Sequence, residues 1–142
     1  MAGFSNEEDV ALIRAYCGVA RESIIDININ ATSFWQRILG HFRSEINNEN
    51  ARNIKPIQCR VTMLKKHVKR YVGFVKQSIR GMADGGYDVA TAYQLGKNAY
   101  EAEGRLWTHG TVYEIFKNTF ADEYDTAEIP PPFLGNLNGE EA

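Results

Sequence analysis

The feature that most constrains the fold is a run of apolar side chains repeated every three to four residues, beginning just after Pro56. That spacing is the period of an amphipathic α-helix, and a proline in the first helical turn loses no hydrogen bond. The pattern continues to Arg80, and Gly81 follows. We therefore predict a helix of about seven turns over residues 56–80. Its apolar positions are Ile57, Val61, Leu64, Val68, Tyr71, Val72, Val75 and Ile79.

The same part of the chain concentrates the positive charge. Residues 52–80 hold nine of the sixteen Lys and Arg residues and no Asp or Glu, whereas the remainder has seven basic against eighteen acidic residues. The net charge of −2 thus conceals a segment at +9 and a remainder at −11. A helix face that is merely solvated usually interleaves positive and negative side chains, so that alternative is less favoured here. Like charges on one helix repel each other, and a polyanionic partner would remove that repulsion.

A helical wheel divides the basic segment by role. Gln58, Thr62 and Lys65 fall together near the start of one flank, where a helix in the major groove of DNA would meet base edges. Gln suits adenine and Lys suits guanine, so these three are the base-edge candidates. Arg60 points nearer the apolar side, and we expect it to pair with an acidic residue of the first helix, such as Glu8 or Asp9. The phosphate candidates are Arg52, Lys55, Lys66, Lys69, Arg70, Lys76 and Arg80.

Helix starts are predicted by capping boxes, in which Ser or Thr is followed three residues later by Glu or Gln. The three boxes are Ser5–Glu8, Ser33–Gln36 and Thr111–Glu114, and Asp88 is suited to cap a further helix. The predicted helices besides 56–80 are about 6–19, 34–46, 89–103 and a short one from the third box. No strong strand pattern is present, so the predicted fold class is all-α.

Composition excludes several classes of function. No apolar run approaches the roughly 20 residues that span a bilayer, so no membrane partner is expected. The two cysteines suit a reducing compartment and, with the three histidines, form no metal-ligand spacing. We find no phosphate-binding loop, no nucleophile elbow and no paired carboxylates. The chain is therefore predicted to be no enzyme and to need no metal, no cofactor and no small-molecule substrate.

Several short motifs, in order, resemble those of a Myb/SANT-like domain of the trihelix type, the kind associated with Harbinger-type transposons. The matching stretches are FSNEED (4–9), FWQRI (34–38), RN (52–53) with IQCR (57–60), and YVGF (71–74). The part from Ala92 to Phe116 resembles the family's following helix pair. Two positions depart from the pattern, since Phe4 and Val61 stand where Myb repeats have their first and third core tryptophans. Trp35 keeps the aromatic type.

The resemblance implies a three-helix, helix-turn-helix core over residues 4–80 with a long third helix. A C-terminal helical extension over 81–124 is expected to pack on that core, and the acidic, proline-rich stretch 125–142 is expected to be disordered. The implied function is a nuclear protein that places its third helix in the major groove of double-stranded DNA. It would serve as a transcription regulator or as a transposase-targeting accessory, with a transposase or co-regulator as partner.

Two other readings stay open. In the first, the chain is a non-enzymatic adaptor whose basic helix binds an acidic protein. In the second it binds RNA, although the basic residues are not interleaved with aromatic ones in the way that stacking on bases requires.

Overall fold

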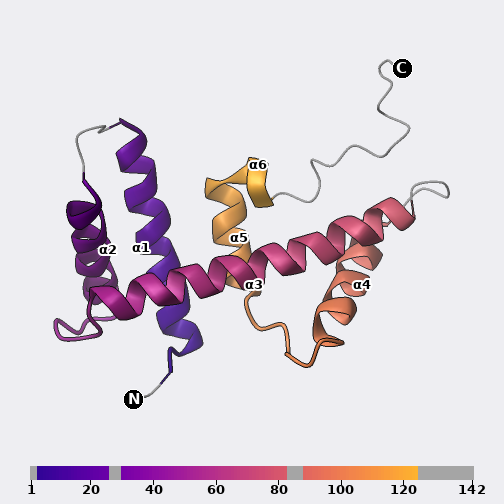
Figure 1. The fold of residues 1–142 in the computed structure, drawn as a ribbon, viewed down its shortest axis with the longest axis horizontal. Helices are drawn as coiled ribbons and strands as arrows, with labels where there is room; N and C mark the ends of the chain where they lie inside the picture. Colours follow the sequence, from indigo (N-terminus) through magenta and orange to yellow (C-terminus); the bar gives the residue numbers. More distant parts are fainter. Residues whose placement is uncertain (1–2, 26–29, 83–87, 125–142) are drawn as a thin grey trace. The chain divides into compact units, whose positions relative to one another are not determined.

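The computed structural model describes residues 3–25, 30–82 and 88–124, and these residues form helices and no strand (Figure 1). The prediction of an all-α fold is confirmed. The helices are α1 (Asn6–Ile25), α2 (Ala31–Glu45), α3 (Ile54–Gly81), α4 (Val89–Glu101), α5 (Gly110–Thr119) and α6 (Ala121–Tyr124). Among the described helices, none combines the length and apolar character that would let it cross a bilayer. The expected tail after Tyr124 lies outside the described residues.

Two predicted helix starts are confirmed by their hydrogen bonds. The hydroxyl of Ser5 accepts the Glu8 N–H at 3.1 Å, and the Glu8 carboxylate accepts the Ser5 N–H at 3.1 Å, which is the reciprocal pattern of a capping box. Asp88 caps α4 by accepting the Ala90 N–H. Each cap satisfies backbone donors that a helix start otherwise leaves without partners.

The other two capping boxes are wrong. Asn30 caps α2 by accepting the Ser33 N–H at 2.8 Å, so Ser33 lies in the first turn rather than before it. Asn30 directly precedes the first helical residue, so its side-chain oxygen accepts an N–H of the first turn that Ser33, already inside the helix, cannot cap. At α5 the carbonyl of His109 accepts the Tyr113 N–H at 2.9 Å, which places Thr111 inside the helix as well.

The helical part of the chain divides into two compact units that share α3. The first contains α1, α2, α3 as far as Lys66, and α5. The second contains α3 from His67 onward, α4 and α6. This division does not follow the predicted boundary near Arg80, because α5 packs against α1 while α4 packs on the later turns of α3.

In the first unit α2 runs back alongside α1, and the early turns of α3 together with α5 complete a four-helix arrangement (Figure 1). Tyr16 links these elements, with its ring centroid 5.9 Å from those of Phe34 and Trp35 and 6.4 Å from that of Phe116. The unit is closed by side chains that are almost wholly removed from water. They include Leu12, Ile13, Val19, Ile38, Phe42, Ile57, Val61, Leu64, Val112 and Phe116.

In the second unit α4 packs on α3 at very short range. Gly96 makes this approach possible, because a Cβ at that position would lie 2.4 Å from Val75 Cγ2. Beyond α4 the chain returns to α3, where the Trp107 ring stacks on that of Tyr71 with centroids 4.0 Å apart. Tyr124 of α6 is fully buried and closes this second core.

Candidate nucleic-acid interface

The face of α3 that packs inward agrees with the predicted amphipathic pattern. All eight apolar positions from Ile57 to Ile79 are buried. The opposite face is exposed and carries five cations and five uncharged residues. Its exposed positions are Lys55, Cys59, Thr62, Met63, Lys66, Lys69, Arg70, Gly73, Gln77 and Arg80.

The three base-edge candidates lie within the first unit on successive turns of α3. Thr62 is exposed, and its hydroxyl donates to the carbonyl of Gln58 at 3.1 Å. Gln58 is half-buried, and its side-chain amide makes no hydrogen bond to the described residues. Lys65 is half-buried and holds its ammonium 4.7 Å from the centre of the Tyr16 ring. The structure thus brings an amide, a hydroxyl and an ammonium onto one flank.

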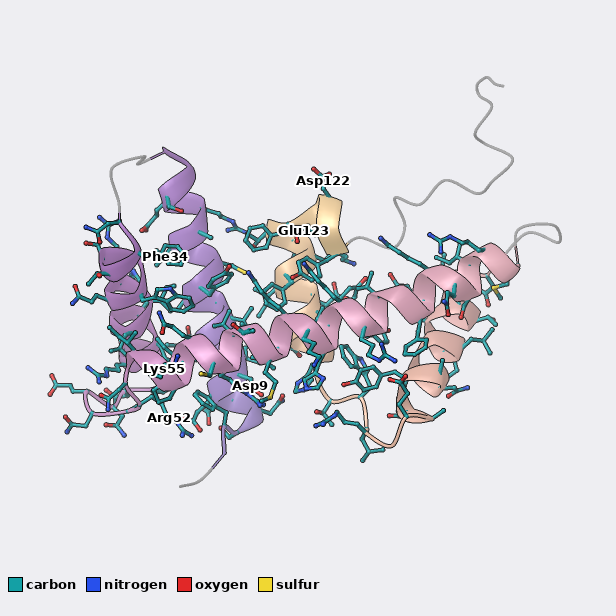
Figure 2. The ribbon with its side chains drawn as sticks, in the orientation of Figure 1. Asp9, Phe34, Arg52, Lys55, Asp122 and Glu123 are labelled. Atoms are coloured by element: carbon teal, nitrogen blue, oxygen red, sulfur yellow. The ribbon has the colours of Figure 1, made fainter. Side chains whose placement is uncertain are left out.

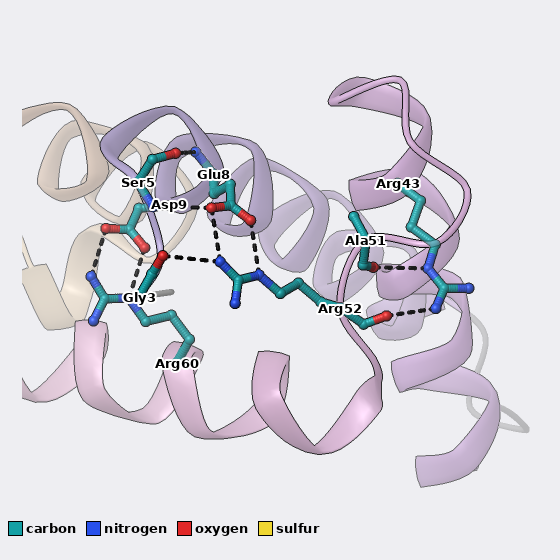
Figure 3. A network of polar contacts seen from close by, with 8 residues as sticks. All are labelled: Gly3, Ser5, Glu8, Asp9, Arg43, Ala51, Arg52 and Arg60. Atoms are coloured by element: carbon teal, nitrogen blue, oxygen red, sulfur yellow. Dashed lines mark hydrogen bonds and ion pairs between the residues drawn. The ribbon is translucent and has the colours of Figure 1, made fainter. Parts of the chain in front are cut away.

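Arg52 is the phosphate candidate that the structure places elsewhere. Its backbone has a positive φ of 57°, and its side chain turns to the start of α1, with only 13% of its area exposed. There its guanidinium donates twice to the Glu8 carboxylate at 2.9 Å and once to the Gly3 carbonyl at 3.0 Å (Figure 3). The hydrogen bonds that Arg52 donates to Glu8 raise the pKa of Arg52 and lower that of Glu8. Arg52 is therefore a structural clamp, and we remove it from the phosphate set.

Arg60 forms the acidic pairing that the wheel predicted. Its guanidinium donates to both carboxylate oxygens of Asp9 at 2.7 and 2.8 Å, and Asp9 is 1% exposed (Figure 3). The hydrogen bonds that Arg60 donates to Asp9 raise the pKa of Arg60. Because planar bidentate pairs fix geometry as well as charge, this contact sets where the first turns of α3 lie on α1. Arg43 completes the network by donating to the carbonyls of Ala51 and Arg52.

In the second unit two of the phosphate candidates already have acidic partners. The Lys69 ammonium lies 3.1 Å from a carboxylate oxygen of Glu123 on α6, which is labelled in Figure 2. Arg70 donates through two nitrogens to the carboxylate of Glu103, just beyond α4. The Arg70 guanidinium lowers the pKa of Glu103. These side chains are about half exposed, unlike those of the Arg60–Asp9 pair.

The later turns of α3 also form an open concavity of about 500 Å³ in the second unit. Gly73 contributes to its floor, since no heavy atom lies within 4 Å of where its Cβ would be. The remaining lining residues supply four cations, an amide and an aromatic ring. They are Lys69, Arg70, Phe74, Lys76, Gln77 and Arg80. A concave surface of this charge suits an anion that carries several oxygens, such as a phosphodiester.

Four of the phosphate candidates on α3 have no carboxylate within 4 Å among residues 3–25, 30–82 and 88–124. They are Lys55, Lys66, Lys76 and Arg80. Lys55 lies at the very start of the helix (Figure 2) and Arg80 in its last turn. Two of these cations therefore belong to each unit, and all four are on a single continuous helix.

The histidines, cysteines and carboxylates of the described part of the chain are the side chains that could bind a metal ion. No group of three or more His, Cys, Asp or Glu residues there is arranged to hold a metal ion. Cys17 is buried, which raises the pKa of its thiol, whereas Cys59 is exposed on the outer face of α3.

Sequence reasoning missed Glu103 and Glu123 as neighbours of the basic face. Each is separated from its cation by more than thirty residues along the chain, and no local pattern links them. α6 was also missed, because its four residues are too few to show a helical period.

Comparison with known proteins gives one similarity. The chain is 28% identical over 108 residues to glutathione S-transferase T3 of Arabidopsis thaliana, a match that covers 72% of this chain and 18% of that protein. The chain thus spans less than a fifth of the length of this relative. No family model matches the chain, and no solved structure matches it.

Proposed function

We propose that this chain is a DNA-binding protein of the Myb/SANT-like type that lays α3 in the major groove of duplex DNA. The observation that carries the proposal is the basic face of α3. There Lys55, Lys66 and Arg80 are exposed and Lys76 is half-buried, and none of the four has a carboxylate within ion-pair distance in the described residues. Uncompensated charges on one helix face repel each other, and a line of phosphates relieves that repulsion.

In this proposal the first unit reads sequence. Gln58, Thr62 and Lys65 meet base edges, because a glutamine amide can pair with the adenine edge and a lysine with the guanine edge. Lys55 and Lys66 flank them and contact phosphates, which positions the helix without carrying sequence information. The Arg60–Asp9 pair supports this role by fixing the same turns of α3 on α1.

The second unit supplies further contacts to the phosphate backbone of the DNA through the concavity that Lys76 and Arg80 help to line. As a nuclear protein, the chain would act as a transcription regulator or as an accessory that targets a transposase. We propose no enzymatic activity. The similarity to a glutathione transferase covers too little of that protein to transfer its activity, and a rate of glutathione conjugation to 1-chloro-2,4-dinitrobenzene above the uncatalysed background would contradict this.

The test is a fluorescence-anisotropy titration of labelled duplex DNA at several salt concentrations. Four or five phosphate contacts predict that log K falls against log[salt] with a slope of about −4. Neutralising the four phosphate candidates without a carboxylate partner, in the variant K55Q/K66Q/K76Q/R80Q, should flatten that slope to between about −1 and 0. The matched control R14Q/R37Q/K97Q/R105Q removes the same charge from helices and loops other than α3, and it should keep most of the slope.

The outcome against the proposal is equally definite. Salt-independent binding, or an equal loss in the two variants, would show that α3 does not contact the phosphates. Where the salt slope agrees with the proposal, random-duplex selection on the unmodified chain identifies the preferred site. Q58A should then relax the preference at one base while leaving the salt slope unchanged.

A second candidate function is an adaptor whose basic helix binds an acidic protein segment. It is favoured by one observation, namely that Lys69 and Arg70 already hold carboxylates. Competition against labelled duplex DNA at physiological salt separates the two functions. Poly-glutamate should displace the duplex as well as unlabelled DNA does if the basic helix binds acidic proteins, and it should displace the duplex poorly if the helix binds in the DNA groove.

A further inference from the structure

Two carboxylates from outside α3 lie on its basic side within the second unit. Glu103 accepts two hydrogen bonds from Arg70, and Glu123 lies 3.1 Å from the Lys69 ammonium. Lys69 and Arg70 both line the basic concavity. The two acidic groups therefore hold the cations that a phosphate entering this concavity would contact.

Each carboxylate lies close in the chain to an aromatic anchor, of which Tyr124 is buried and Trp107 is half-buried. Tyr124, directly after Glu123, is fully buried, and its ring lies 5.8 Å from the Lys69 ammonium. Glu103 is placed by the segment that follows α4, where Gly104 turns the backbone with a φ of 102° and Trp107 stacks on Tyr71. The anchors keep each carboxylate next to its cation.

We propose that Glu103 and Glu123 are internal competitors of DNA phosphate, which weaken the binding of the second unit to any duplex and so leave discrimination to the base-edge residues of the first unit. This inference rests on the proposed function. Side chains in both pairs are about half exposed, with 54% for each cation and 43% and 54% for Glu103 and Glu123. Exposed pairs are weak enough for a phosphodiester to displace them, so the carboxylates attenuate binding and do not abolish it.

The test measures random-sequence duplex DNA binding by anisotropy for the full chain and for E103Q/E123Q. Removing both competitors should tighten binding about 3- to 30-fold, since each exposed pair contributes a factor of a few. The salt slope should also become steeper by about one. In the unmodified chain the glutamates that phosphate displaces take up salt cations as DNA binds, whereas the glutamines of the variant do not. The matched control is D122N/E114Q, which changes the net charge equally. Asp122 makes no ion pair among the described residues, and Glu114 pairs with Lys117 outside α3.

Thermal unfolding of each variant confirms that the fold is kept. Tightening in E103Q/E123Q alone supports the inference, while equal tightening in the control would show a general effect of net charge and overturn it. An unchanged affinity in E103Q/E123Q, with salt-dependent binding by the unmodified chain, overturns the inference and leaves the proposed function standing. If no form of the chain binds duplex DNA, the proposed function fails and the inference fails with it.

Discussion

Arginines of the same segment have opposite roles, and burial of the carboxylate partner decides between them. Asp9 is 1% exposed, so its charge is stable there only while Arg60 holds it. Glu103, by contrast, stays in contact with water beside Arg70. Removing one member of a buried pair leaves a desolvated charge, whereas an exposed charge is simply hydrated. Arg60 is therefore a structural residue, although the sequence places it among the cations.

This difference predicts a large loss of stability at one arginine and a small one at another. R60Q should lower the free energy of unfolding by about 3 kcal/mol, because it leaves Asp9 buried without its partner. R14Q breaks the exposed Arg14–Glu45 pair, with 59% and 38% of the side chains exposed, and should cost less than about 1 kcal/mol. Urea unfolding at neutral pH measures both. Equal losses would mean that the Arg60–Asp9 contact is not the clamp between α1 and α3.

At the scale of elements, the long helix was the most predictable part of the fold. Eight apolar residues at helical spacing specify one buried face, and α3 differs from its predicted bounds by only two residues at the start and one at the end. Short-range capping was less predictable. Ser33 and Ser5 open the same kind of motif, but only a nearby Asn30 decides that α2 begins earlier.

Most contacts between elements could not be predicted from the sequence, and the Arg60–Asp9 pair of α3 and α1 is an exception. Whether Arg70 faces solvent or Glu103 depends on where the chain after α4 returns, and that follows from the docking of Trp107 on Tyr71. The candidate interface was thus predictable as a helix face but not in the pairing of its cations. Arg52 shows the same limit, since its removal from the phosphate set depends on a positive φ and a distant carboxylate.

The packing of α4 on α3 predicts opposite effects for two glycine substitutions. G96A should destabilise the chain by about 2 kcal/mol, because the new methyl group would lie 2.4 Å from Val75 Cγ2 and 2.9 Å from Val75 backbone atoms. G73A places its methyl group in open space on an exposed helical position and should stabilise by about 0.5–1 kcal/mol. Thermal unfolding decides, and a G96A variant as stable as the parent would mean that the two helices are farther apart.

At the scale of the whole molecule, the charge distribution is a balance between one basic helix and an acidic remainder. Nine cations lie in residues 52–80, and all eighteen acidic residues lie outside them. Each unit ties the two parts together with at least one arginine–carboxylate pair, Arg52–Glu8 in the first and Arg70–Glu103 in the second. The acidic residues therefore hold the helix in place in addition to keeping the net charge near zero.

This balance predicts that stability falls on acidification. The guanidinium partners lower the pKa of Glu8 and of Glu103 below the ordinary value of 4.5 in the folded chain. The unfolded chain therefore binds protons first, so the contribution of these pairs is present above about pH 4.5 and is lost as the pH falls through the lower folded-state pKa values. Urea unfolding between pH 7 and pH 3 should show this loss, and E8Q/E103Q should reduce it. The control E49Q/D122N removes two carboxylates that make no ion pair in the described residues and should keep the loss. If both variants reduced the acid-induced loss of stability equally, its cause would be general repulsion among the cations of the protonated chain and not the loss of the two arginine–glutamate pairs.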